Sequence, residues 1–113
     1  MIMRVLAIGL LLAAAGAFSG AAAQAPDGKA LYDEHCKKCH GVLGNPPQTM
    51  KKKYQKIASF DAKFLTAHSE DSIVKVLTRG KSEDMQSFKM KMNKDEMTVV
   101  AKYVRDLAAK AKQ

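Results

Sequence analysis

The residues best suited to chemistry are two cysteines and a histidine in the run Cys36-Lys37-Lys38-Cys39-His40. This is a single C-x-x-C-H motif, the pattern that attaches haem covalently. Because the cysteines are three residues apart, about one helical turn, both thiols can face one side and add to the two vinyl groups of a porphyrin. The imidazole of His40 would then be the proximal iron ligand. The motif predicts one haem c, bound through two thioethers.

Other uses of a cysteine pair fit the sequence less well. A disulfide-exchange motif normally lies where a strand leads into a helix, and no β-rich run precedes Cys36. A structural zinc site takes four ligands, and only His35 and His68 are left to complete a set with the motif. A plain disulfide between Cys36 and Cys39 is the alternative wherever haem is not supplied.

Residues 1–23 have the pattern of a cleaved secretory signal peptide. Met1–Arg4 form a positive n-region, an apolar h-region follows, and small residues offer a cleavage site before Gln24. Cleavage after Ala25 is one alternative, and an uncleaved membrane anchor is another, although the apolar run is shorter than the roughly 20 residues of a spanning helix. We therefore predict a single small domain over residues 24–113, exported to the oxidising periplasm, with no membrane span after cleavage.

Lysines give the chain a formal net charge of +8. We expect this positive surface to steer the protein onto acidic-faced redox proteins or membrane redox complexes, in brief and salt-sensitive encounters. The alternative is a basic face that is only solvated. Nucleic-acid binding would need stacking or base-reading elements, and the export signal argues against it. The clustered lysines are Lys37, Lys38, Lys51, Lys52, Lys53, Lys56, Lys89, Lys91 and Lys94.

Helical patterns dominate after the signal, and no alternating strand of useful length is visible. Asp27 is placed to cap a first helix that runs into the cysteine motif, and residues 41–47 are rich in turn formers. Asp61 and Ser69 are placed to cap two further helices, of which the second ends at Gly80. The pattern predicts an all-α fold.

The last helix has the best-defined start. Asn93 as N-cap and Glu96 three residues later form a capping-box pair, and Met92 and Met97 suit a hydrophobic staple across it. An apolar stripe at helical spacing follows. Together these elements predict three to five helices packed around one covalently attached haem. The stripe consists of Met97, Val100, Ala101, Val104, Leu107 and Ala108.

A second axial ligand on the iron decides the class of function. The thioether of methionine is a soft ligand that favours reduced iron and raises the potential. Met92 and Met97 are already explained by the last helix, and Met50 lies among lysines soon after the motif, as a core or loop residue. Met85 and Met90 remain, both in the irregular segment before the last helix.

Three motifs follow one another along the chain: C-x-x-C-H-G, then Met85-Gln86-Ser87-Phe88, then a helix with an acidic start that ends in Ala101-Lys102-Tyr103-Val104. In this order they resemble the class I c-type cytochromes. That family commonly has M-P-x-F at its axial-methionine loop, so the resemblance implies Met85 as the axial ligand, with Met90 and His68 as alternatives. Gln86 stands where the family usually has proline, which implies a less rigid loop and easier ligand exchange.

The resemblance extends to the packing around the haem. The family pairs a glycine and an aromatic residue on its first helix with an aromatic residue on its last, and Gly28, Tyr32 and Tyr103 match those positions. Its proximal histidine usually donates the second ring N–H to a proline carbonyl. Pro46 and Pro47 both qualify, and we expect Pro47.

This resemblance implies an electron carrier. With His40 and Met85 both bound, the iron would cycle between Fe(II) and Fe(III) and leave no open site for a substrate. We therefore expect a soluble, monomeric carrier of single electrons that is not an enzyme and has no catalytic residues. A haem subunit of a larger respiratory, photosynthetic or dehydrogenase complex is the alternative, and an open-site haem enzyme or gas-binding protein is a second one.

Overall fold

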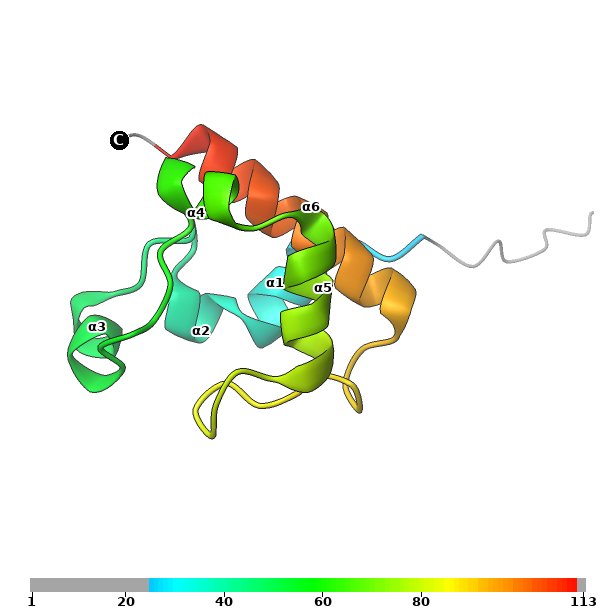
Figure 1. Ribbon diagram of the computed structural model, residues 1–113, viewed down its shortest axis with the longest axis horizontal. Helices are drawn as coiled ribbons and strands as arrows, with labels where there is room; N and C mark the ends of the chain where they lie inside the picture. The colour runs from blue at the N-terminus through cyan, green and yellow to red at the C-terminus, as the bar shows by residue number, and fades with distance from the viewer. Residues whose placement is uncertain (1–24, 112–113) are drawn as a thin grey trace, which may run out of the picture.

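The computed structural model describes residues 25–111, and this part of the chain is all-α (Figure 1). The all-α prediction is confirmed, whereas the predicted signal peptide, residues 1–23, lies outside the described residues. None of the helices within residues 25–111 is both long and apolar enough to cross a bilayer. The helices are α1 (Gly28–His35), α2 (Lys37–His40), α3 (Gln48–Lys53), α4 (Ala62–Ala67), α5 (Glu70–Arg79) and α6 (Lys94–Lys110).

Helix α6 begins at the predicted capping box. The Asn93 side chain accepts the backbone N–H of Glu96 at 2.8 Å, and the Glu96 carboxylate accepts the backbone N–H of Asn93 at 3.0 Å. Met92 and Met97, on either side of the cap, are both buried. The capping box and the staple therefore fix where α6 begins and how the preceding segment enters it.

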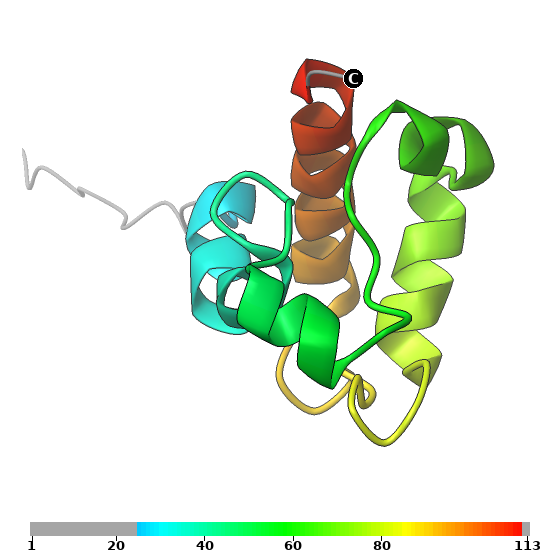
Figure 2. The same cartoon turned by 90° about the vertical axis from the view of Figure 1, so that its left-hand side faces the viewer.

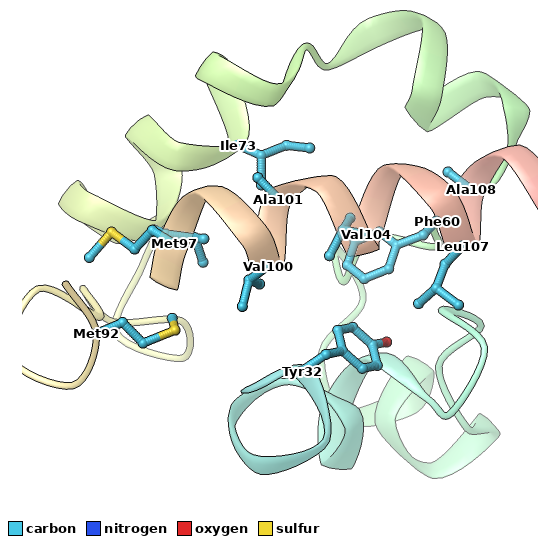
Figure 3. Close-up of a cluster of buried hydrophobic side chains, with 11 residues drawn as sticks. Tyr32, Phe60, Ile73, Met92, Met97, Val100, Ala101, Val104, Leu107 and Ala108 are labelled. Atoms are coloured by element: carbon cyan, nitrogen blue, oxygen red, sulfur yellow. The ribbon is translucent and has the colours of Figure 1, made fainter. Parts of the chain in front are cut away.

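The core is built along α6, which packs against α1, α4 and α5. Figure 2 shows α6 between α1 on one side and α4 and α5 on the other. In Figure 3, side chains of α6 reach toward Tyr32 of α1 and toward Ile73 of α5. Every residue of the predicted α6 stripe is buried, and burial of this stripe is the main force that joins the helices. The core consists of Tyr32, Phe60, Ile73, Leu77, Met92, Met97, Val100, Ala101, Val104, Leu107 and Ala108.

The glycine and aromatic positions suggested by the resemblance do meet between α1 and α6. A Cβ at Gly28 would lie 2.5 Å from the carbonyl oxygen of Val99, so only glycine allows this approach. The rings of Tyr32 and Tyr103 are 5.2 Å apart. This close crossing brings the chain that follows α1 to the centre of the molecule.

Helices α1, α4 and α5 begin at the predicted caps. The side chains of Asp27, Asp61 and Ser69 accept backbone N–H groups at the starts of α1, α4 and α5. The first helix runs up to Cys36 as expected, and the non-helical dihedral angles of Cys36 then separate α1 from α2. Helix α3 was not predicted: its N-cap is Pro47, which makes no side-chain cap bond.

Candidate haem-binding site

The cysteine motif is a tight turn between α1 and the end of α2. The carbonyl oxygen of Cys36 accepts the N–H groups of Cys39 at 3.2 Å and of His40 at 2.9 Å. Both cysteines are half-buried free thiols. Burial, and then the neighbouring Cys39, raises the pKa of the Cys36 thiol to about 12. The turn thus holds two thiols and an imidazole close together.

The ring of His40 is fixed on two sides. Its Nδ1 lies 3.1 Å from the carbonyl oxygen of Ala58, and its face stacks on the ring of Phe60, with 4.7 Å between centroids and 17° between planes. Burial lowers the pKa of His40, which favours the neutral imidazole that binds metals. With Nδ1 donating to a carbonyl, the lone pair of Nε2 is left for a ligand.

The expectation that Pro47 would accept this hydrogen bond is wrong. The N–H of Phe60 donates to the carbonyl oxygen of Gly44 at 2.7 Å, which holds the chain just before α4 against the turn after the motif. Ala58 is thereby brought to His40, although 18 residues separate them. Gly44 permits the close approach, since its φ is +84° and an added Cβ would lie 2.8 Å from Phe60.

A buried tyrosine ties the motif to α1. The hydroxyl of Tyr32 donates to the carbonyl oxygen of Gly41 at 2.6 Å, and the Tyr32 side chain is fully buried. Burial raises the pKa of Tyr32 well above its ordinary value, so the hydroxyl stays a donor. The backbone directly after His40 is therefore anchored in the core.

Met85 lies on a segment that we call the Met85 strap, residues 81–89, between α5 and α6. Its carbonyl oxygen accepts the N–H groups of Lys81 at 2.8 Å and Ser82 at 3.3 Å, and its own N–H donates to the Ser82 hydroxyl at 3.3 Å. The Met85 side chain is half-buried against the core. Further along the strap, the ring of Phe88 meets that of His35, the residue before the first cysteine, at 5.9 Å. The structure thus brings the strap to the motif.

The other candidate ligands lie in surroundings different from those of Met85. Met90 is 93% exposed, and its side chain is not packed in the core. His68 is the C-cap of α4, where its ring lies 4.5 Å from that of Phe64 and its carbonyl oxygen accepts from Arg105. His35 is half-buried against Phe88.

The residues gathered here fit a covalently attached haem by their chemistry. Two thiols one turn apart suit two thioether bonds, and imidazole and thioether groups are donor types that haem iron takes. A zinc site gains no support, because no group of three or more His, Cys, Asp or Glu side chains in the described part of the chain could hold a metal ion.

Charge is strongly uneven around this site. Residues 36–60 contain six lysines and no acidic residue, whereas the rest of residues 25–111 has eleven basic and eleven acidic residues. Within residues 25–111 the lysine ion pair is Lys29 with Asp33, so none of those six lysines is paired there. The net positive charge of the described chain therefore sits on the motif, on α3 and on Lys56 just after α3.

Three contributors to the site were not predicted: Ala58, Phe60 and Ser82. Ala58 and Ser82 act through a backbone carbonyl and a small hydroxyl, which carry no sequence signal of their own. For Phe60, the sequence offered one signal, which is that an apolar aromatic residue directly precedes the predicted N-cap Asp61.

Comparisons with known proteins agree with this site. A family model described as "Cytochrome C oxidase, cbb3-type, subunit III" matches residues 23–104. A solved structure described as "KustC0563 c-type cytochrome" is 34% identical with a TM-score of 0.65, and the match covers 73% of this chain and 98% of that one. A point mutant of the same cytochrome matches at 33% identity and a TM-score of 0.63, over 72% of this chain and 98% of that one. No curated protein matches the chain.

The family model spans most of the described residues, and the matched structure is covered almost end to end. The chain therefore belongs to this family of c-type cytochromes, electron-transfer proteins that carry covalently bound haem c and are not enzymes.

Proposed function

We propose that this protein carries single electrons on one haem, which is attached through Cys36 and Cys39 and ligated by His40 and Met85. The observation that carries the proposal is the orientation of His40, whose Nδ1 is tied to Ala58 while its Nε2 is left for a metal. One C-x-x-C-H motif in the sequence supports one haem.

The surroundings of the methionines favour Met85 over Met90 as the second axial ligand. Met85 is half-buried, and its backbone N–H and carbonyl groups take part in three hydrogen bonds within the strap, whose Phe88 touches His35 beside the motif. Met90 is almost fully exposed. Because a buried, ordered thioether loses less conformational entropy on binding iron than an exposed one, Met85 is the better ligand.

Haem iron supplies the one-electron chemistry, between Fe(II) and Fe(III). The chain sets the conditions for it. Ala58 and Phe60 orient the imidazole of His40, and the Met85 thioether favours the reduced state and raises the potential. The apolar core excludes water from the buried side of the site.

The six lysines of residues 36–60, none of which is ion-paired within residues 25–111, support docking to an acidic partner surface. Lys52, Lys53 and Lys56 are exposed, and the exposed side chains of Val42 and Leu43 follow the motif directly. A basic rim beside a small apolar area suits brief, salt-sensitive encounters of a monomeric carrier with acidic-faced redox proteins or membrane redox complexes.

Export completes the proposal: residues 1–23 are a signal peptide, and residues 24–113 form the cytochrome domain in the periplasm. The signal-peptide pattern and membership of a family with covalently bound haem c support this location. The mass of the protein purified from a periplasmic fraction tests it, since cleavage before Gln24 gives one expected value. A mass that includes residues 1–23 would overturn it.

Optical spectroscopy of the ferric holoprotein tests the ligation. We expect a long-wavelength methionine–iron charge-transfer band that is lost in Met85→Ala and kept in Met90→Ala. A band that depends on Met90 instead, or a high-spin spectrum with ready CO binding to the ferrous protein, would contradict the proposal.

A haem subunit of a larger complex is a second candidate, because the matching family model is described as a subunit of an oxidase. Gentle detergent extraction followed by size-exclusion chromatography separates the two. A freely migrating monomer supports the carrier, and co-migration with an oxidase supports the subunit.

A further inference from the structure

The C-terminal end of α5 holds the Met85 strap. The last carbonyl groups of a helix have no partner within the helix, and in α5 two of them are used by the strap. The carbonyl oxygen of Leu77 accepts the N–H of Phe88 at 2.8 Å, and that of Thr78 accepts the hydroxyl of Ser87 at 2.6 Å. The strap therefore caps α5, and α5 in turn fixes the strap.

Ser87 makes two of the strap's contacts with one oxygen. Besides donating to Thr78, its hydroxyl accepts the N–H of Lys89 at 3.1 Å. Thr78 is the penultimate residue of α5, and Ser87 lies two residues after Met85. The hydroxyl thus joins the end of a packed helix to the chain on both sides of Phe88.

The absence of a side chain at Gly80 lets the strap come this close. Gly80 has φ of +74°, and an added Cβ would lie 2.5 Å from the backbone nitrogen of Ser87 and 2.9 Å from the carbonyl carbon of Gln86. Gln86 has no ring to restrict the backbone after Met85, as a proline would. Contact with α5, rather than the residue after Met85, restrains the strap.

We propose that Ser87 is a positioning residue for Met85, acting through its hydrogen bond to Thr78. This inference rests on the proposed ligation by Met85. An added ligand such as imidazole binds the ferric iron only when Met85 moves away, and the strap must move with it. Every contact that holds the strap on α5 therefore weakens imidazole binding.

The test is an imidazole titration of ferric holoprotein. Ser87→Ala should tighten the apparent affinity about two- to fivefold, the equivalent of one exposed hydrogen bond, and weaken the methionine–iron band at equal imidazole. Ser87→Thr keeps a hydroxyl and should restore most of the wild-type affinity. Ser72→Ala is the matched control, because the Ser72 hydroxyl donates to the Ser69 carbonyl at the other end of α5, at 2.9 Å; its affinity should equal that of the wild type.

The outcomes separate this inference from the ligation on which it rests. If Met85→Ala keeps the band, the proposed ligand is wrong. If Met85→Ala loses the band while Ser87→Ala binds imidazole like the wild type, only the role of Ser87 is overturned. Equal tightening in Ser72→Ala and Ser87→Ala would mean a general loosening of α5 and would also overturn that role.

Discussion

The hydroxyl of Tyr32 donates a 2.6 Å hydrogen bond to the carbonyl oxygen of Gly41, across the buried contact between α1 and the end of the cysteine motif. Gly41 itself has φ of +87° and leaves no space for a Cβ, which would lie 2.1 Å from the Asn45 carbonyl oxygen. The backbone conformation directly after His40 therefore depends on the glycine at position 41 and on the hydrogen bond from the Tyr32 hydroxyl.

Replacing Tyr32 with phenylalanine should destabilise the holoprotein by about 1–2 kcal/mol at pH 7, because a buried carbonyl loses its donor while the ring packing stays. Chemical denaturation measures the change. Tyr103→Phe is the control, since Tyr103 packs against Tyr32 but is less buried, and it should cost less. Equal losses in the two variants would contradict a special role for the Gly41 bond.

The effect of Tyr32→Phe on stability should depend on pH. Burial raises the pKa of Tyr32 in the folded state above its ordinary value of 10.0, so the unfolded chain releases this proton first. The stability gained from Tyr32 is complete below pH 10 and is lost as the pH rises above it, by up to about 1.4 kcal/mol per pH unit. Stability curves of the wild type and Tyr32→Phe should therefore converge above pH 10, and parallel curves would refute the assignment.

Gly80→Ala should both destabilise the protein and disturb Met85. A residue with a Cβ is strained at φ of +74°, and this Cβ would press on the strap at Ser87. We expect a loss of about 1–3 kcal/mol and a weaker methionine–iron band in the ferric spectrum. Arg79→Ala, at the exposed neighbouring position, should leave the band unchanged. An intact band in Gly80→Ala would show that the strap does not depend on this contact.

Phe60→Ala should have the largest cost of the aromatic substitutions near the site. Phe60 is 7% exposed, and its ring contacts those of Tyr32, His40 and Phe64. Removing it should cost about 3–5 kcal/mol in denaturation experiments, as for other buried phenylalanines. Phe64→Ala, at a half-buried position, should cost clearly less. The reverse order would place the centre of this cluster at Phe64.

Local signals explain what could be predicted from the sequence. Asp27, Asp61, Ser69 and Asn93 each cap a helix within their own turn, and the α6 stripe repeats at helical spacing. The cysteine motif carries its chemistry in five adjacent residues. These features depend on neighbours in the chain, so the starts of α1, α4, α5 and α6 could be predicted without knowing the fold, and the attachment through Cys36 and Cys39 stays a prediction of the motif.

The contacts that orient the site span longer distances in sequence and mostly use backbone atoms. The partner of His40 is the carbonyl of Ala58, 18 residues away, and any residue type could supply it. The family resemblance suggested Pro47 because it could not show how the chain folds back after α3. Likewise, the Ser87 hydroxyl donates to the backbone carbonyl of Thr78, and no pattern of side chains in the sequence predicts this hydrogen bond.

The uneven charge of residues 36–60 predicts that the position of a lysine matters more than the total charge. Replacing the exposed Lys52, Lys53 and Lys56 with glutamine should slow oxidation by the anion ferricyanide severalfold at low ionic strength and speed oxidation by a cationic cobalt complex, as stopped-flow mixing measures. These effects should fade as salt is added.

The matched control removes the same amount of positive charge from helices α5 and α6. Lys75, Lys102 and Lys110 are exposed on α5 and α6, where six basic residues stand with five acidic ones. Their replacement by glutamine lowers the net charge equally, so any difference between the two triple variants reports position. We expect the control to change the ferricyanide rate much less. Equal slowing would show that net charge alone governs the encounter and that the face formed by the motif and α3 has no special part in docking.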